Sequence, residues 1–231
     1  LVEHLRQEDD PSLIPIISEE GWGSKQNLAG LADLPTEIAD GISLEMIGYV
    51  RPQITWMQSA WWQWFAWRPD VSSIEDVWHY QRHTVKWDTR FRQAENAPCV
   101  HNTIARLQDS SVDIVRDFLE LLDVDPAAYP AGRLVNTSVT STHIGLYRRF
   151  PALRRPNDPR IDMLIQKLLP AGKPAPWAVP HSLAERIIEE MKPENKALAA
   201  RLDSASRARM MADQRWWSLD AYAGKWEAGE P

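Results

Sequence analysis

A largely apolar run from Leu44 to Val50 constrains this chain most, because Arg51-Pro52 ends it and a second apolar segment follows at once. The run LEMIGYV has the length and composition of a buried strand. In residues 54–67 apolar side chains lie nearly all the way round a helical projection, which predicts a buried helix. A buried strand followed directly by a buried helix is typical of α/β proteins.

The remaining segments extend this pattern. Residues 13–18 predict an earlier strand, and residues 99–107 contain a possible third one. A helix is expected from a capping box at Ser72 and Glu75 to about Phe91. Further helices are expected at 113–122, 142–150, 162–169, 182–191 and 196–202. The predicted fold class is therefore α/β, a three-layer parallel sheet with helical crossovers and a helix-rich C-terminal half, forming a single domain over residues 1–231.

Composition narrows the classes of function. The net charge of −6 argues against nucleic acid as the main partner, because binding phosphate backbones requires a basic surface. The single cysteine, Cys99, excludes a disulfide framework and argues against a structural zinc site. Apolar runs are far shorter than the roughly 20 residues of a membrane helix, and no signal peptide is visible. We expect a cytoplasmic protein that binds no metal.

Charged side chains follow two of the predicted strands. Arg51 comes directly after the strand at 44–50, and Glu19 and Glu20 follow the strand at 13–18. In parallel sheets ligands bind outside the carboxyl ends of the strands. An arginine fork at this edge and the hydroxyl of Ser59, eight residues later, can bind one tetrahedral anion from two sides. The alternative is a salt-bridged surface arginine and a small serine at a helix contact.

The stretch from Gly48 to Gln53, together with Ser59, resembles the 3′-phosphate-binding motif of sulfotransferases that use 3′-phosphoadenosine 5′-phosphosulfate (PAPS). The bacterial branch of that family has motifs of the type Tyr-x-Arg-x-Gln and Ser-x-Tyr-x-Gln. The second motif reads Ser-Ala-Trp-Trp-Gln here, at residues 59–63. Shorter segments agree in order: residues 16–22 with a strand–Ser-x-Glu-Gly-aromatic segment, 115–122 with an Asp-Phe-Leu helix and 135–138 with an Asn-x-Ser loop.

One element of the family has no counterpart in this sequence. It is a loop near the N-terminus, rich in lysine, glycine and threonine, that holds the 5′-phosphosulfate. Residues 1–11 contain neither glycine nor lysine, and the chain begins without methionine in what reads as the middle of a helix. We expect the loop to lie upstream of residue 1; if the natural protein lacks it, a degenerate relative is the expectation.

The resemblance implies a fold like that of P-loop NTPases and a specific set of roles. Arg51 and Ser59 bind the cofactor PAPS, and a hydroxyl of a saccharide or small metabolite accepts the sulfuryl group. Glu20 is the candidate base and Glu19 its neighbour, unless both are solvated turn residues. The candidates for substrate binding are Trp22, Trp62, Asn136 and Ser138.

Three alternatives stay open from the residues alone. Arginines at 148, 149, 154, 155 and 160 form the only basic cluster, which either attracts an anionic acceptor or is a solvated face. A kinase on the same kind of sheet would need a full phosphate loop and a carboxylate for magnesium. A catalytically degenerate interaction protein would use the aromatic residues at 61–67 as an interface.

Overall fold

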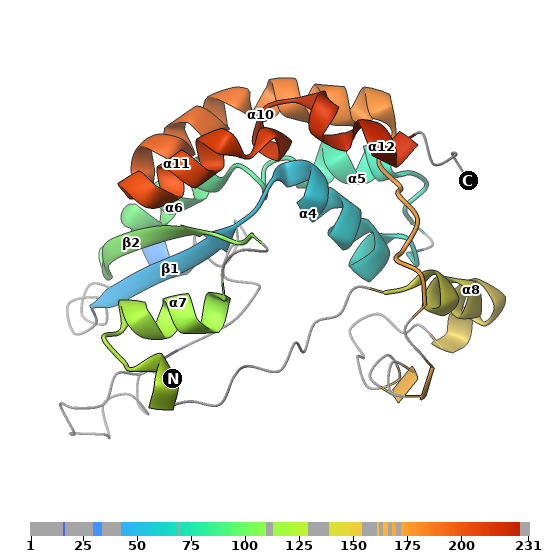
Figure 1. Ribbon diagram of the computed structural model, residues 1–231, viewed down its shortest axis with the longest axis horizontal. Helices are drawn as coiled ribbons and strands as arrows, with labels where there is room; N and C mark the ends of the chain where they lie inside the picture. The colour runs from blue at the N-terminus through green and yellow to red at the C-terminus, as the bar shows by residue number, and fades with distance from the viewer. Residues whose placement is uncertain are drawn as a thin grey trace.

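The computed structural model describes residues 16, 30–33, 43–68, 70–109, 113–128, 139–153, 161, 164, 165, 168, 169 and 172–226. Figure 1 shows a mixed α/β protein in which helices predominate around a small sheet. The described sheet has two parallel strands, β1 (Leu44–Val50) and β2 (Val100–Leu107). The α/β class and the strand at 44–50 are therefore confirmed.

A helical crossover joins the two strands, as parallel pairing requires. It contains α4 (Gln53–Ala60), the π-helix η2 (Trp61–Phe65), α5 (Ile74–Gln81) and α6 (Trp87–Glu95). The strands pair in register from Glu45 opposite Asn102 to Val50 opposite Leu107. Of the strand predicted at 13–18 only Ile16 is described, and it is 56% exposed and outside any strand.

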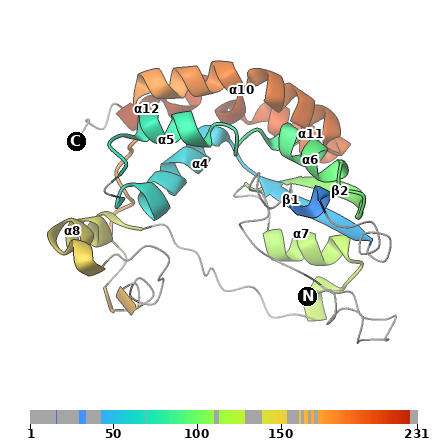
Figure 2. The ribbon, with the colours of Figure 1, turned by 180° about the vertical axis from the view of Figure 1, so that it is seen from behind.

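Alternate side chains of β1 face different helices. Gly48 lies against Phe91 of α6, and Val50 packs in a cluster with Leu198 of α10 (His181–Arg201). Tyr49, between them in the sequence, hydrogen-bonds to α7 (Ile114–Leu121) instead. Figures 1 and 2 accordingly show α7 on one side of the strands and α6 and α11 (Ser204–Ala212) on the other.

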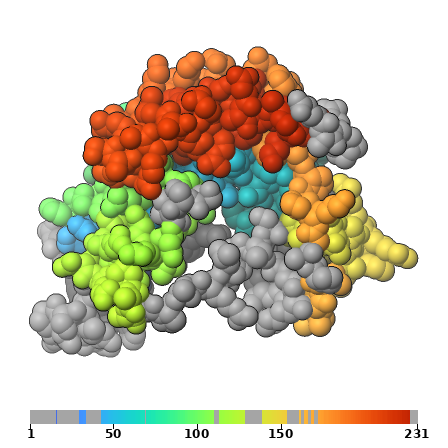
Figure 3. Space-filling model, in the orientation of Figure 1, coloured from blue at the N-terminus to red at the C-terminus, as the bar shows by residue number. Residues whose placement is uncertain are grey.

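Helix α10 forms a common wall for two hydrophobic clusters. Its first half contributes Leu183 and Met191 to a cluster with α4 and α5, and its second half contributes Leu198 to the cluster under the sheet. Figure 3 shows the C-terminal helices lying over α4, whose surface is visible below them. The other described elements are η3 (Pro126–Ala128), α8 (Ser141–Arg149), η4 (Pro151–Leu153), η5 (Gln214–Trp216), η6 (Leu219–Tyr222) and α12 (Ala223–Trp226).

The structure corrects the bounds of three predicted helices. The cap of α5 is Ser73 rather than Ser72, because the Ser73 hydroxyl accepts the backbone N–H of Asp76 at 3.1 Å. That helix ends at Gln81, and a separate helix begins at Trp87. Conversely, the helices expected at 182–191 and 196–202 are one helix that continues through Pro193. Burial of side chains on both sides of the proline, at Met191 and Asn195, offsets its missing hydrogen bond.

The packing of α6 against β1 can be tested at Gly48, where the two elements are in close contact. A Cβ atom at position 48 would lie 2.7 Å from Cζ of Phe91, a residue that is 2% exposed. We expect Gly48→Ala to lower the free energy of unfolding by about 1–3 kcal/mol, because overpacking a core strains it. The measurement is urea unfolding followed by circular dichroism.

The matched control is Gly145→Ala on α8, where an added Cβ would have no atom within 4 Å. Alanine is the better helix former by about 1 kcal/mol, so this variant should be as stable as the parent or more stable. Equal stability of Gly48→Ala and the parent would show that Phe91 does not pack against β1.

Candidate functional site

Strand β1 delivers Arg51 to the carboxyl edge of the sheet. Arg51 is the first residue after the strand, and its carbonyl oxygen accepts a hydrogen bond from Nε1 of Trp87 at 3.0 Å. Pro52 follows in an extended conformation (φ −53°, ψ 134°), and α4 begins at the next residue. The position predicted for Arg51 is thus the observed one, and its side chain is half-buried.

The residues two positions before and two positions after Arg51 are Tyr49 and Gln53, and a side-chain hydrogen bond holds each of them. The Tyr49 hydroxyl donates to Oδ2 of Asp117 at 2.7 Å; burial, and then this hydrogen bond, raise the pKa of Tyr49 well above its usual value. On the other side Nε2 of Gln53 donates to Oδ1 of Asn195 at 2.7 Å. Arg51 therefore lies between one anchor to α7 and one anchor to α10.

The second anchor continues into the C-terminal region. Nδ2 of Asn195 donates to the carbonyl oxygen of Trp216 at 3.1 Å. Gln53 and Asn195 are 3% and 1% exposed, so this short network lies in the protein interior. A buried polar network whose groups are paired fixes the elements that it joins. It ties the start of α4 to α10 and to η5.

Ser59 lies near the end of α4, six residues after the helix begins. At 1.5 Å per residue, this corresponds to about 9 Å along the helix axis. Its side chain is half-buried, like that of Arg51, and neither residue belongs to the hydrophobic clusters. Arg51 and Ser59 are thus parts of one strand–helix unit and have partly accessible side chains.

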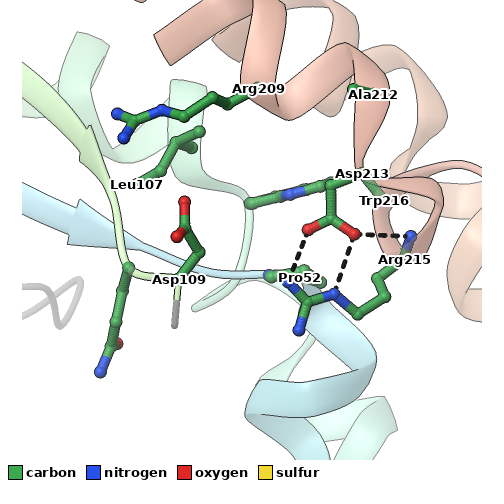
Figure 4. A pocket seen from close by; sticks show the side chains of 9 residues that line it. Pro52, Leu107, Asp109, Arg209, Ala212, Asp213, Arg215 and Trp216 are labelled. Carbon is green, nitrogen blue, oxygen red and sulfur yellow. Dashed lines mark hydrogen bonds and ion pairs between the residues drawn. The ribbon is translucent and has the colours of Figure 1, made fainter. Parts of the chain in front are cut away.

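A pocket of about 360 Å³ opens at the carboxyl ends of both strands. Pro52 comes from the end of β1 and Leu107, Gln108 and Asp109 from the end of β2, while the opposite wall comes from α11 and η5 (Figure 4). That wall consists of Arg209, Ala212, Asp213, Arg215 and Trp216. This pocket lies at the carboxyl ends of the strands, where ligands bind in parallel sheets, but its lining includes neither Arg51 nor Ser59.

The two arginines that line this pocket differ in whether a described carboxylate pairs with them. Asp213 binds Arg215 through two contacts, Nε to Oδ1 at 2.8 Å and Nη2 to Oδ2 at 2.9 Å, which raises the pKa of Arg215. Arg209 is exposed and donates to the Ser206 hydroxyl at 3.1 Å; among the described residues it makes no ion pair. Figure 4 shows its guanidinium extending over Leu107, with the carboxylate of Asp109 below.

A second pocket, of about 320 Å³, lies where the π-helix η2 meets α8. Trp62 is 6% exposed and donates its Nε1 hydrogen to the carbonyl oxygen of Pro176 at 2.9 Å. The lining residues are Trp61, Trp62, Ala66, Trp67, Arg68, Tyr147, Arg148 and Pro151. Trp62 thus does line a pocket, but one that differs from the pocket at the strand ends.

Five of the predicted site residues lie outside the described part of the chain: Glu19, Glu20, Trp22, Asn136 and Ser138. Within the described residues no group of three or more metal-ligating side chains is found. No helix in the same residues is long and apolar enough to cross a membrane. No local pattern in the sequence links Arg209, Asp213 and Asn195 to Arg51, so their place near the strand ends could not be predicted.

Comparison of the chain with protein-family models, with curated protein sequences and with solved structures finds no significant match.

The anchor at Gln53 can be tested by removing its donor. Gln53→Leu leaves Oδ1 of the buried Asn195 without its partner, so we expect the free energy of unfolding to fall by about 1–3 kcal/mol. Gln58→Leu is the matched control, since Gln58 also makes side-chain hydrogen bonds, to backbone groups of Pro176 and Ala178, but is only half-buried. Urea unfolding of both variants is the measurement. An equal or greater loss in Gln58→Leu would contradict the importance of the buried network.

Proposed function

We propose that this chain is a sulfotransferase domain that binds PAPS through Arg51 and Ser59. The observation that carries the proposal is the position of Arg51 at the carboxyl end of a parallel strand, with Ser59 on the helix that follows directly. The same arrangement is what the motif resemblance implies. We also propose that the chain has a fold like that of P-loop NTPases. The two-stranded parallel sheet with its helical crossover is compatible with that fold.

The chemistry of these two side chains suits a phosphate group. A guanidinium offers two parallel N–H donors to a tetrahedral anion, and a serine hydroxyl adds a third donor from another direction. The anchors at Tyr49 and Gln53 support this role, since they hold the backbone on both sides of Arg51. The pocket beside Pro52 carries charges of both signs, with Arg209 and Arg215 beside Asp109 and Asp213.

In the proposed reaction the acceptor hydroxyl attacks the sulfur of PAPS in line with the leaving group. An S–O bond to the acceptor forms, the bond from sulfur to the 5′-phosphate oxygen breaks, and adenosine 3′,5′-bisphosphate leaves with the electron pair. A base takes the proton of the hydroxyl. We assign this role to Glu20, with Glu19 as its neighbour, and we assign contacts with the acceptor to Trp22, Trp62, Asn136 and Ser138. The acceptor is a saccharide or a small metabolite, and no metal takes part in the proposed step.

The proposal predicts that adenosine 3′,5′-bisphosphate stabilises the protein. At a concentration of about 100 times the dissociation constant the melting temperature should rise by about 5–10 °C, because the ligand binds only the folded state. Arg51→Ala should abolish the rise by removing the guanidinium, and Ser59→Ala should reduce it. Differential scanning fluorimetry measures each shift.

Two controls make this experiment specific. Arg186→Ala removes an exposed arginine of α10, and its shift should equal that of the parent. Adenosine 5′-monophosphate lacks the 3′-phosphate and should give a smaller shift than the bisphosphate. If the bisphosphate does not stabilise the intact protein, or stabilises Arg51→Ala equally, the cofactor assignment is wrong.

A further inference from the structure

The pocket between η2 and α8 is walled by aromatic rings. The rings of Trp62 and Trp67 lie 6.1 Å apart between centroids at an interplanar angle of 49°, and Trp67 meets Tyr147 edge to face at 5.3 Å. Trp61 meets Trp62 at 6.3 Å. Trp62 and Tyr147 are buried, whereas Trp61 and Trp67 are half-buried, so a flat ligand can stack on the accessible parts of Trp61 and Trp67.

Hydrogen bonds hold this wall in place. Nε1 of Trp67 donates to the carbonyl oxygen of Trp62 at 2.7 Å. Nε1 of Trp62 and Nε2 of Gln58 both donate to the carbonyl oxygen of Pro176, at 2.9 and 2.8 Å. Tyr147, on the α8 side, is 1% exposed. Because its rings are fixed before a ligand arrives, the pocket loses little conformational entropy on binding. The π-helix η2, which carries Trp61 and Trp62, is a feature frequent at functional sites.

The charge of the pocket is positive. Arg148 is exposed and places its Cζ 5.9 Å from the centroid of the Trp62 ring, and it makes no ion pair with any residue that the structure describes. The other charged side chain of the lining, Arg68, is paired with Asp70. Among the residues that the structure describes, the lining contains no Asp or Glu. An arginine stacked on an aromatic face keeps the edge of its guanidinium available for an anion.

We propose that this pocket binds a single ring that carries a negatively charged group, such as a carboxylate, sulfate or phosphate. The ring stacks on the tryptophan faces, and the anionic group pairs with Arg148. The volume of about 320 Å³ is at the lower end for ligand pockets, which favours a one-ring ligand over a nucleotide. Both a sugar ring and an aromatic ring satisfy this chemistry.

The place of this pocket in the molecule connects it with the proposed function. Trp62 follows Ser59 by three residues in a continuous helical segment, a rise of about 4.5 Å. The ring would then be the sulfuryl acceptor, an acidic saccharide or an acidic aromatic metabolite. This role rests on the proposed function, whereas the binding of an anionic ring does not.

The test compares anionic and neutral rings of matched shape. Saturation-transfer NMR and calorimetry on the full chain would use benzoate against phenol and glucuronate against glucose. We expect the anionic member of at least one pair to bind about tenfold more tightly than the neutral one, the value of one charge-assisted hydrogen bond. The pair that shows this difference identifies the ring as aromatic or saccharide.

Two neighbouring arginines provide the matched variants. Arg148→Gln should abolish the preference for the anionic ring, whereas Arg149→Gln should keep it, because Arg149 stacks on Phe150 and does not line the pocket. Equal binding of neutral and anionic rings, no binding by either pair, or the same effect of both substitutions would overturn the proposal.

The same variants separate this inference from the cofactor assignment. Arg51→Ala should lose the stabilisation by adenosine 3′,5′-bisphosphate and keep the preference for the anionic ring. Arg148→Gln should keep that stabilisation and lose the preference. Ring binding without any response to the bisphosphate would leave the pocket standing and remove its role as an acceptor site. A response to the bisphosphate without ring binding would remove the pocket and leave the cofactor site.

Discussion

The buried hydrogen bond between Gln53 and Asn195 is the interaction on which the site depends most. It joins residues that are 142 positions apart, at the start of α4 and in the middle of α10. Because α10 contributes to both hydrophobic clusters, this bond links the edge of the sheet to most of the described core. The carbonyl group of Trp216 extends the link to the wall of the strand-end pocket. The strand end, the helix start and that wall are therefore fixed relative to one another.

Net charge and local charge differ in this protein. The chain carries a charge of −6, yet each pocket has an arginine that makes no ion pair with a described carboxylate, Arg209 in one and Arg148 in the other. Arg215 shows the opposite case, since Asp213 binds its guanidinium through two contacts. A repulsive overall field falls off within about 8–10 Å at ordinary ionic strength. A single arginine that lines a pocket can therefore attract a small anion, whereas the net negative charge would still repel an extended polyanion.

The local parts of the fold were predictable from sequence. Strand β1 has the predicted bounds, and α7 begins directly after its cap residue Asp113, whose carboxylate accepts the N–H groups of Val115 and Arg116. The continuity of α10 through Pro193 was not predictable, because burial against other elements decides it. The composition of the pocket walls was not predictable from sequence either. Arg209 reaches the strand ends, and Tyr147 reaches η2, through tertiary contacts that leave no periodic signal.

The tryptophans that follow Ser59 combine two properties that aliphatic residues lack. Each indole has a large apolar body for the core and an N–H group that needs a partner when buried. In Trp62 and Trp67 these groups bind the carbonyl oxygens of Pro176 and Trp62, so the segment is held by directed bonds as well as by packing. Leucine at these positions would be smaller, would donate no hydrogen bond to these carbonyl groups and would offer no flat face to a ligand. The α4–η2 segment can thus support the core on one side and a rigid aromatic pocket on the other, one helical turn beyond Ser59.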